Sequence, residues 1–186
     1  MISGWQRFSS RLGDAGAVRS WLIEPGSLTA RCQDSCDRFR IRVVTSGRGA
    51  ALADEAALVG ARRGRPWVRE VILECDGVPV IFAHTVLPDR PRGRLTRWLA
   101  RLGARSLGSL LFAYPGFRRG QLEFRRLDGR HRLHTRAIVF FPTATALWAR
   151  RSLHRLGRQQ VLVTEVFLPA LGALKSRGGP QGSGSS

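Results

Sequence analysis

The chain has 186 residues, 43% of them hydrophobic, and a formal net charge of +18 in which Lys175 is the only lysine. This length fits one domain with a sizeable core, and no apolar run reaches the ~18 residues of a membrane span, so we expect no stable membrane insertion. The basic residues are scattered and do not alternate with aromatic residues as in single-strand binders. A small anionic ligand fits the charge equally well, because arginine forks match carboxylates, and we expect no nucleic acid.

The amino-terminal region lacks the apolar segment of a secretory signal, which indicates a cytoplasmic protein. Its cysteines are odd in number, as expected in a reducing compartment: Cys32, Cys36 and Cys75. The histidines belong to no C-x-x-C or H-E-x-x-H pattern, so we expect no metal.

Residues 14–38 predict two short helices. Asp14 is placed to cap the first helix, and Ser27 is placed to cap the second after the break at Pro25-Gly26. The alternating residues 39–47 predict a strand. Residues 50–60 fit either a short helix or a loop.

The clearest element is a hairpin in "PWVREVILECDGVPVIFAHTVLP", where two β-rich runs flank Asp76-Gly77. Both turn residues tolerate positive φ, as a tight hairpin requires. An amphipathic helix follows over 92–103, with leucines and a tryptophan on one face. Residues 106–112 predict a further helical turn or two.

The remaining sequence predicts strands over 121–128 and 160–168. The segment 136–156 has no single pattern, but its second half alternates as a strand does. A turn at 157–159 separates it from the last strand. Strands outnumber helices, and hairpins dominate. We therefore expect one α+β domain over 1–175, a mostly antiparallel sheet with helices on one side, followed by a flexible tail over 176–186.

Strand alternation puts two charged residues on apolar faces. Arg69 shares a face with Trp67, Val71 and Leu73, and Glu165 lies among valines and Phe167. A buried charge needs a partner. Pattern alone favours pairing of the two with each other over binding of the two ends of a ligand, and an edge strand would remove the question.

Two further positions raise the same question. In "LWARRSL", alternation points only one of Arg150 and Arg151 inward. His84, in "IFAHTVLP", suits a core or a pocket wall, and a lone histidine in a strand is more often structural.

Four segments, "PWVREVILECDGVPVIFAHTVLP", "RSLGSLLF", "LWARRSL" and "VLVTEVFLPAL", resemble the chorismate–pyruvate lyase family in order and spacing. The resemblance implies a single α+β domain with helical flaps over a small internal pocket. It also implies a cytoplasmic, typically monomeric enzyme that converts chorismate to 4-hydroxybenzoate and pyruvate without cofactor or metal, at the first committed step of ubiquinone biosynthesis.

The resemblance also assigns site residues. Arg69 would bind the ring carboxylate, Glu165 would accept a hydrogen bond from the 4-hydroxyl, and Leu107 would contribute its backbone N–H. Leu28, in the early helical flap, would contact the ligand through its backbone. Possible secondary anion contacts are Arg150, Arg151 and His84, the last of which replaces an arginine of some family members.

No G-x-S-x-G, Walker or G-x-G-x-x-G motif indicates another enzyme class. Two alternatives stay open from the sequence. One is a non-catalytic domain of the same fold that binds a small anion or effector. The other is a basic nucleic-acid-binding protein.

Overall fold

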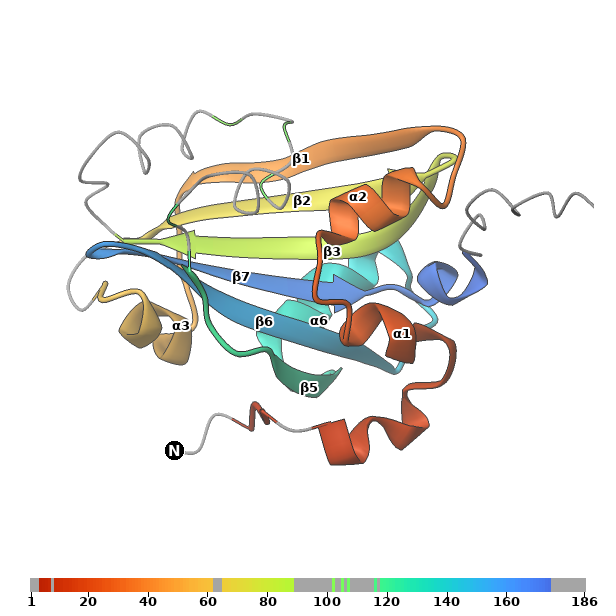
Figure 1. Cartoon of the computed structure of the whole chain (residues 1–186), viewed down its shortest axis with the longest axis horizontal. Helices are drawn as coiled ribbons and strands as arrows, with labels where there is room; N and C mark the ends of the chain where they lie inside the picture. Colours follow the sequence, from red (N-terminus) through yellow and green to blue (C-terminus); the bar gives the residue numbers. More distant parts are fainter. Residues whose placement is uncertain are drawn as a thin grey trace, which may run out of the picture.

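An antiparallel sheet forms the centre of the molecule (Figure 1). The computed structural model describes residues 4–7, 9–61, 65–88 and 118–174, and the single positions 102, 105, 107 and 116. In this part of the chain the sheet has seven strands in the order β1-β2-β3-β7-β6-β4, and β5 also pairs with β6. The α+β class is therefore confirmed. The strands are β1 Phe39–Arg48, β2 Trp67–Cys75, β3 Val78–Leu87, β4 Arg118–Arg119, β5 Glu123–Asp128, β6 Ala146–Leu156 and β7 Gln159–Phe167.

Short helices surround this sheet. They are the 3-10 helix η1 Ser9–Val18, α1 Arg19–Leu22, α2 Leu28–Gln33, α3 Ala53–Leu58, α6 Arg132–Ala137, η2 Ile138–Phe140 and η3 Pro169–Ala173. In the described ranges no helix is long and apolar enough to cross a membrane.

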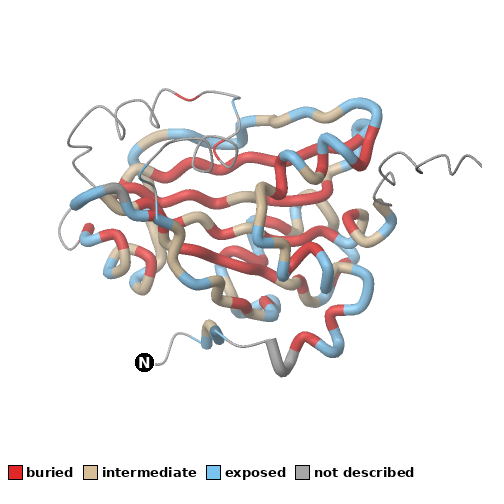
Figure 2. The backbone as a smooth tube through the Cα atoms, viewed as in Figure 1, coloured by how far each residue is buried: buried red, intermediate tan, exposed pale blue. Residues whose placement is uncertain are grey.

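The helices cover both faces of the sheet. On one face, Trp21 and Leu28 of α1 and α2 pack in a cluster with Leu73 and other strand residues. On the other face, Leu133 of α6 packs in a separate cluster with Phe82. The expectation of helices on one side thus holds for η1, α1, α2 and η3, whereas α6 packs on the opposite face. The central strands carry apolar residues on both faces, and they are buried along their length (Figure 2).

The β2–β3 hairpin turns at Asp76 and Gly77, whose φ angles are 51° and 82°, as expected for this turn chemistry. Beyond the turn the register slips. Glu74 still pairs with Pro79, but Leu73 pairs with Ile81, so Val80 is the extra residue of a β-bulge. Because side chains alternate, this single residue decides which face each later residue of β3 occupies.

Most predicted elements are present. The two helices of 14–38 are α1 and α2, and the Ser27 hydroxyl accepts a hydrogen bond from the Ala30 N–H at 3.3 Å as the N-cap of α2. Asp14 does not cap α1, whose N-cap is Val18. Residues 50–60 contain α3, and the strands predicted at 39–47, 121–128 and 160–168 correspond to β1, β5 and β7.

Three helical segments were not predicted. One is η3, and the others are α6 and η2, over 132–140, whose arginines and histidines give no clear apolar period. The predicted helix over 92–103, most of 106–112 and the tail over 176–186 lie outside the described residues.

Candidate functional site

Arg69 and Glu165 project from the same face of the sheet. Arg69 on β2 pairs with Thr85 of β3, and Glu165 on β7 pairs with Ala83 of the same strand. Paired residues share a face, and this is the face covered by α1 and α2. One strand separates the two residues across the sheet, with a two-residue offset along it, which places their Cα atoms about 12 Å apart for ordinary strand spacing and rise.

Arg69 is almost fully buried, at 3% exposure. Its Nη2 donates a hydrogen bond to the backbone carbonyl of Arg105 at 3.1 Å. Burial lowers the pKa of its guanidinium, although an arginine stays charged in proteins. Leu107, two positions after Arg105 in the chain, is buried as well.

Glu165 forms its ion pair with Arg150. The Arg150 Nε donates to the Glu165 Oε2 at 2.6 Å, and the two side chains are 1% and 18% exposed. The pairing between Arg69 and Glu165 that the sequence pattern favoured is therefore wrong. Arg150 lies directly opposite Glu165 in the β6–β7 register, which makes it the inward member of the Arg150–Arg151 pair.

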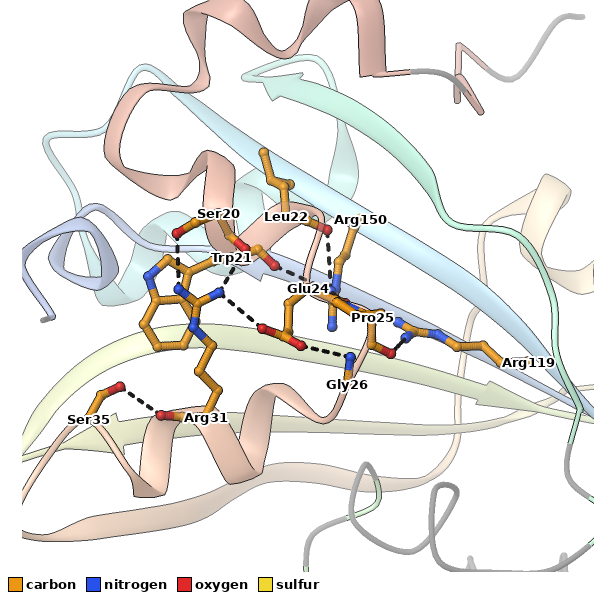
Figure 3. A network of polar contacts seen from close by, with 10 residues as sticks. All are labelled: Ser20, Trp21, Leu22, Glu24, Pro25, Gly26, Arg31, Ser35, Arg119 and Arg150. Atoms are coloured by element: carbon orange, nitrogen blue, oxygen red, sulfur yellow. Dashed lines mark hydrogen bonds and ion pairs between the residues drawn. The ribbon is translucent and has the colours of Figure 1, made fainter. Parts of the chain in front are cut away.

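The same guanidinium also reaches the segment between α1 and α2 (Figure 3). The Arg150 Nη1 donates to the Glu24 carbonyl at 2.6 Å, and it lies 3.3 Å from the carbonyls of Trp21 and Leu22. The last carbonyls of a helix have no partner within it, and a cation is favourable there. Arg150 thus connects Glu165 to the end of α1, and the sequence interpretation gave it no such role.

Leu28 is the first residue of α2 and is 2% exposed. It packs in the same apolar cluster as Trp21 and Val71. As the first helical residue, its N–H has no acceptor within the helix. The structure therefore brings Leu28 to the face that holds Arg69 and Glu165.

Comparison with known proteins decides the family. The family model described as chorismate lyase matches residues 3–174. The chain belongs to the chorismate lyase family. It is 62% identical over 174 residues to a probable chorismate pyruvate-lyase from Dechloromonas aromatica (strain RCB), covering 93% of this chain and 98% of the relative. A protein of the same name from Methylobacillus flagellatus is 41% identical, covering 89% of this chain and 94% of its own.

Solved structures with low sequence identity share the fold. The effector domain of PhnF from Mycobacterium smegmatis aligns with a TM-score of 0.53 at 15% identity, over 80% of this chain and 91% of that domain. The ligand-binding domain of a putative GntR-family regulator from Bordetella bronchiseptica aligns with a TM-score of 0.52 at 16% identity, over 78% and 94%. These likenesses show a shared fold and no more.

Two of the candidate anion contacts lie on the opposite face from Arg69. His84 pairs with Glu70 in the β2–β3 register, and Arg151 pairs with Thr164 in the β6–β7 register. The Arg151 Nη1 contacts Asp54 at 2.7 Å, on the same opposite face. The sheet separates both residues from the site, so of the three candidates only Arg150 lies in it.

His84 is held between two buried carboxylates. Its Nδ1 lies 2.8 Å from Glu70 Oε1, and its Nε2 lies 3.2 Å from Glu55 Oε2. Burial lowers the pKa of His84, but the two carboxylates outweigh burial and raise it to about 9. Glu70 also pairs with Arg136 of α6 at 3.0 Å. In the described part of the chain, no three His, Cys, Asp or Glu side chains are arranged to hold a metal ion.

Proposed function

We propose that this member of the chorismate lyase family is a chorismate–pyruvate lyase that converts chorismate to 4-hydroxybenzoate and pyruvate. The family match and the names of the relatives support this activity. The structural observation that carries it is the placement of Arg69 and Glu165 on one face, with a single strand between them. We further propose a cytoplasmic monomer that acts at the first committed step of ubiquinone biosynthesis.

The two charges suit the two ends of a flat aromatic acid. The guanidinium of Arg69 binds the ring carboxylate through charge-assisted hydrogen bonds, which are strong where water is excluded. The carboxylate of Glu165 accepts a hydrogen bond from the hydroxyl para to it. The backbone N–H groups of Leu107 and Leu28 add neutral donors on the flap side.

The reaction moves one hydrogen within the substrate. The ether bond between ring C3 and the enolpyruvyl oxygen breaks, and the hydrogen on ring C4 passes to the enolpyruvyl methylene carbon. The electrons of the C4–H bond form the last double bond of the aromatic ring, and the enolpyruvyl oxygen becomes the carbonyl of pyruvate. This balance requires no external oxidant or reductant.

A concerted transfer of this kind requires mainly orientation and electrostatic support. Arg69 fixes the carboxylate end of the ring, and Glu165 fixes the hydroxyl end. Glu165 already uses Oε2 to accept from Arg150 at 2.6 Å. That arrangement suits an acceptor that orients the hydroxyl better than a base that removes the C4 hydrogen.

The test follows both products of purified protein with chorismate: pyruvate by a coupled assay, and 4-hydroxybenzoate by chromatography. Losing one partner of a sheltered charge pair costs about 2–5 kcal/mol. We expect kcat/KM to fall roughly 1,000-fold in Arg69→Ala and roughly 100-fold in Glu165→Ala.

Arg40→Ala is the matched control, because Arg40 lies on β1 with its side chain 71% exposed; we expect its rate to stay within twofold of wild type. Absence of both products from wild-type protein would refute the activity. Wild-type rates and product affinity in both site variants would refute the site.

A further inference from the structure

We propose that Arg150 is a positioning residue that couples the orientation of Glu165 to the seating of the helical flap, defined here as residues 19–33. The proposal rests on the proposed function, because it assigns Glu165 to the ligand hydroxyl. Arg150 touches Glu165 and the flap with different nitrogens of one guanidinium. It acts on the ligand only through these two partners.

The contact with Glu165 fixes one carboxylate oxygen. Oε2 accepts from the Arg150 Nε at 2.6 Å. Among the residues that the structure describes, Oε1 accepts no hydrogen bond, and the Glu165 side chain keeps 18% exposure. Arg150 thereby selects which oxygen remains for a ligand hydroxyl and in which direction it points.

The contact with the flap uses three backbone carbonyls, those of Trp21, Leu22 and Glu24. The guanidinium is a rigid plane with its donors at fixed angles, and Arg150 is only 1% exposed. Movement of the flap away from the sheet therefore breaks the hydrogen bonds from the Arg150 Nη1 to the flap carbonyls. The guanidinium can then rotate, and its Nε no longer holds Glu165 in one orientation.

The flap itself is held together as a unit (Figure 3). The Arg31 Nη1 donates to the Ser20 carbonyl at 2.7 Å, and its guanidinium lies over the Trp21 ring at 3.9 Å. The Glu24 Oε1 accepts from the Gly26 N–H at 2.8 Å. Because these contacts tie α1 to α2, pulling on the carbonyls near Glu24 also moves α2 and its first residue, Leu28.

A second sheet arginine provides a control. The Arg119 Nη1 donates to the Pro25 carbonyl at 2.7 Å, and its Nε donates to the Ser152 hydroxyl at 3.2 Å. Arg119 thus anchors the same flap, but its hydrogen bonds do not include Glu165. Replacing Arg119 loosens the flap anchor and removes a charge near Glu165 but leaves the Arg150–Glu165 hydrogen bond in place, whereas replacing Arg150 removes the flap contacts and that hydrogen bond together.

The experiment measures the affinities of 4-hydroxybenzoate and benzoate, and the rate at which 4-hydroxybenzoate dissociates, in wild type, Arg150→Met, Arg150→Lys and Arg119→Met. The ratio of the benzoate Kd to the 4-hydroxybenzoate Kd reports the hydroxyl contact alone. A hydrogen bond to a charged group gives roughly a 10-fold to 100-fold ratio in wild type. A purely structural defect weakens both ligands equally and leaves this ratio unchanged.

We expect Arg150→Met to reduce the ratio to about threefold or less and to speed dissociation at least 10-fold, because both contacts are lost. Arg119→Met should speed dissociation of 4-hydroxybenzoate and weaken both ligands equally, so that the ratio keeps its wild-type value. Arg150→Lys keeps a charge next to Glu165 without the planar fork. The fall in the ratio and the faster dissociation should therefore both be present but smaller than in Arg150→Met. If Arg150→Met does not fold, Arg150→Lys replaces it in the test.

The outcomes separate the two proposals. If wild-type protein binds neither ligand, the proposed function fails. If wild type shows the hydroxyl preference and both Arg150 variants keep it, the coupling proposal is overturned while the proposed function stands. A ratio that also collapses in Arg119→Met would overturn the specific role of Arg150.

Discussion

The two faces of the sheet both bury ionic side chains, but they use them differently. On the opposite face each ring nitrogen of His84 meets a carboxylate, from Glu70 and Glu55, and Glu70 also pairs with Arg136. On the site face Arg150 uses only one oxygen of Glu165, and the rest of its guanidinium holds the flap. We therefore predict that the first arrangement serves stability and that the second leaves an acceptor for the proposed ligand.

The largest effect should come from removing the site-face arginine while keeping its apolar length. We expect Arg69→Met to lower kcat/KM roughly 1,000-fold, about 4 kcal/mol of transition-state stabilisation. The free energy of unfolding should fall by less than about 2 kcal/mol, because methionine keeps the apolar length and the hydrogen bond lost to the Arg105 carbonyl is with a neutral group. Steady-state assays and urea unfolding measure the two quantities. A decrease in the free energy of unfolding of more than about 2 kcal/mol would instead mean that Arg69 serves stability, as the ionic cluster around His84 is expected to do.

The opposite face should show the reverse. Glu55 is 1% exposed and contacts both the His84 ring and the Leu52 N–H. We expect Glu55→Gln to lower the free energy of unfolding by about 3 kcal/mol, because it removes one charge of a buried set. The kcat of the folded fraction should stay within twofold.

Glu74→Gln is the matched control for Glu55→Gln. The partners of Glu74, Arg42 and Arg40, are 39% and 71% exposed, and an ion pair with a solvent-exposed arginine contributes about 1 kcal/mol or less. Equal destabilisation by Glu55→Gln and Glu74→Gln, or a 10-fold loss of turnover in Glu55→Gln, would contradict the distinction between the faces.

Two buried histidines, one on each face, should set opposite pH limits. The pKa of His84 is raised to about 9. Its contribution to the free energy of unfolding is therefore complete below the unfolded-state pKa of about 6.5 and is lost as the pH rises through 9. Burial, with Arg119 and Arg150 nearby, lowers the pKa of His154 to about 4. Its contribution is complete above about 6.5 and is lost as the pH falls through 4.

From these values we expect the free energy of unfolding to fall by about 2 kcal/mol between pH 7 and 9 because of His84, and by about 2 kcal/mol between pH 7 and 5 because of His154. Denaturant unfolding across pH checks this. His84→Gln should flatten the alkaline side alone, and His154→Gln the acid side alone. Identical pH profiles for wild type and His84→Gln would show that His84 does not hold a proton between Glu55 and Glu70.

Sequence alternation was enough to predict the strands and the apolar-face positions of Arg69 and Glu165, because side-chain direction within a strand is local. Assigning residues of different strands to one face requires the register. Counting outward from Asp76-Gly77 pairs Arg69 with His84 and would place both in one site. The bulge at Val80 shifts the register by one residue and moves His84 to the other face. Pro79, which cannot donate to the ladder, was the available signal for this bulge.

The partner of Glu165 could have been found from the sequence. The β6–β7 turn contains two residues, since Leu156 pairs with Gln159, and counting from it pairs Arg150 with Glu165 directly. The predicted turn was one residue longer, which left the register undefined. The carbonyl contacts of Arg150 were out of reach, because Glu24 is 126 residues away in the chain and backbone acceptors leave no pattern in a sequence.

The smallest predicted effect tests whether the site face depends on its flap as a separate unit. Ser27→Ala removes the hydroxyl that caps α2, and a lost N-cap costs about 1 kcal/mol. Because this cost falls on a six-residue helix, amide hydrogen exchange in α2 should speed up roughly fivefold. Amides of β2 and β3 should exchange at wild-type rates. Thr143→Ala, at an exposed position, is the control. If amide exchange in Ser27→Ala became faster to the same extent on both faces of the sheet, the flap would open only together with the whole fold. Ligand exchange could then not proceed through the flap alone.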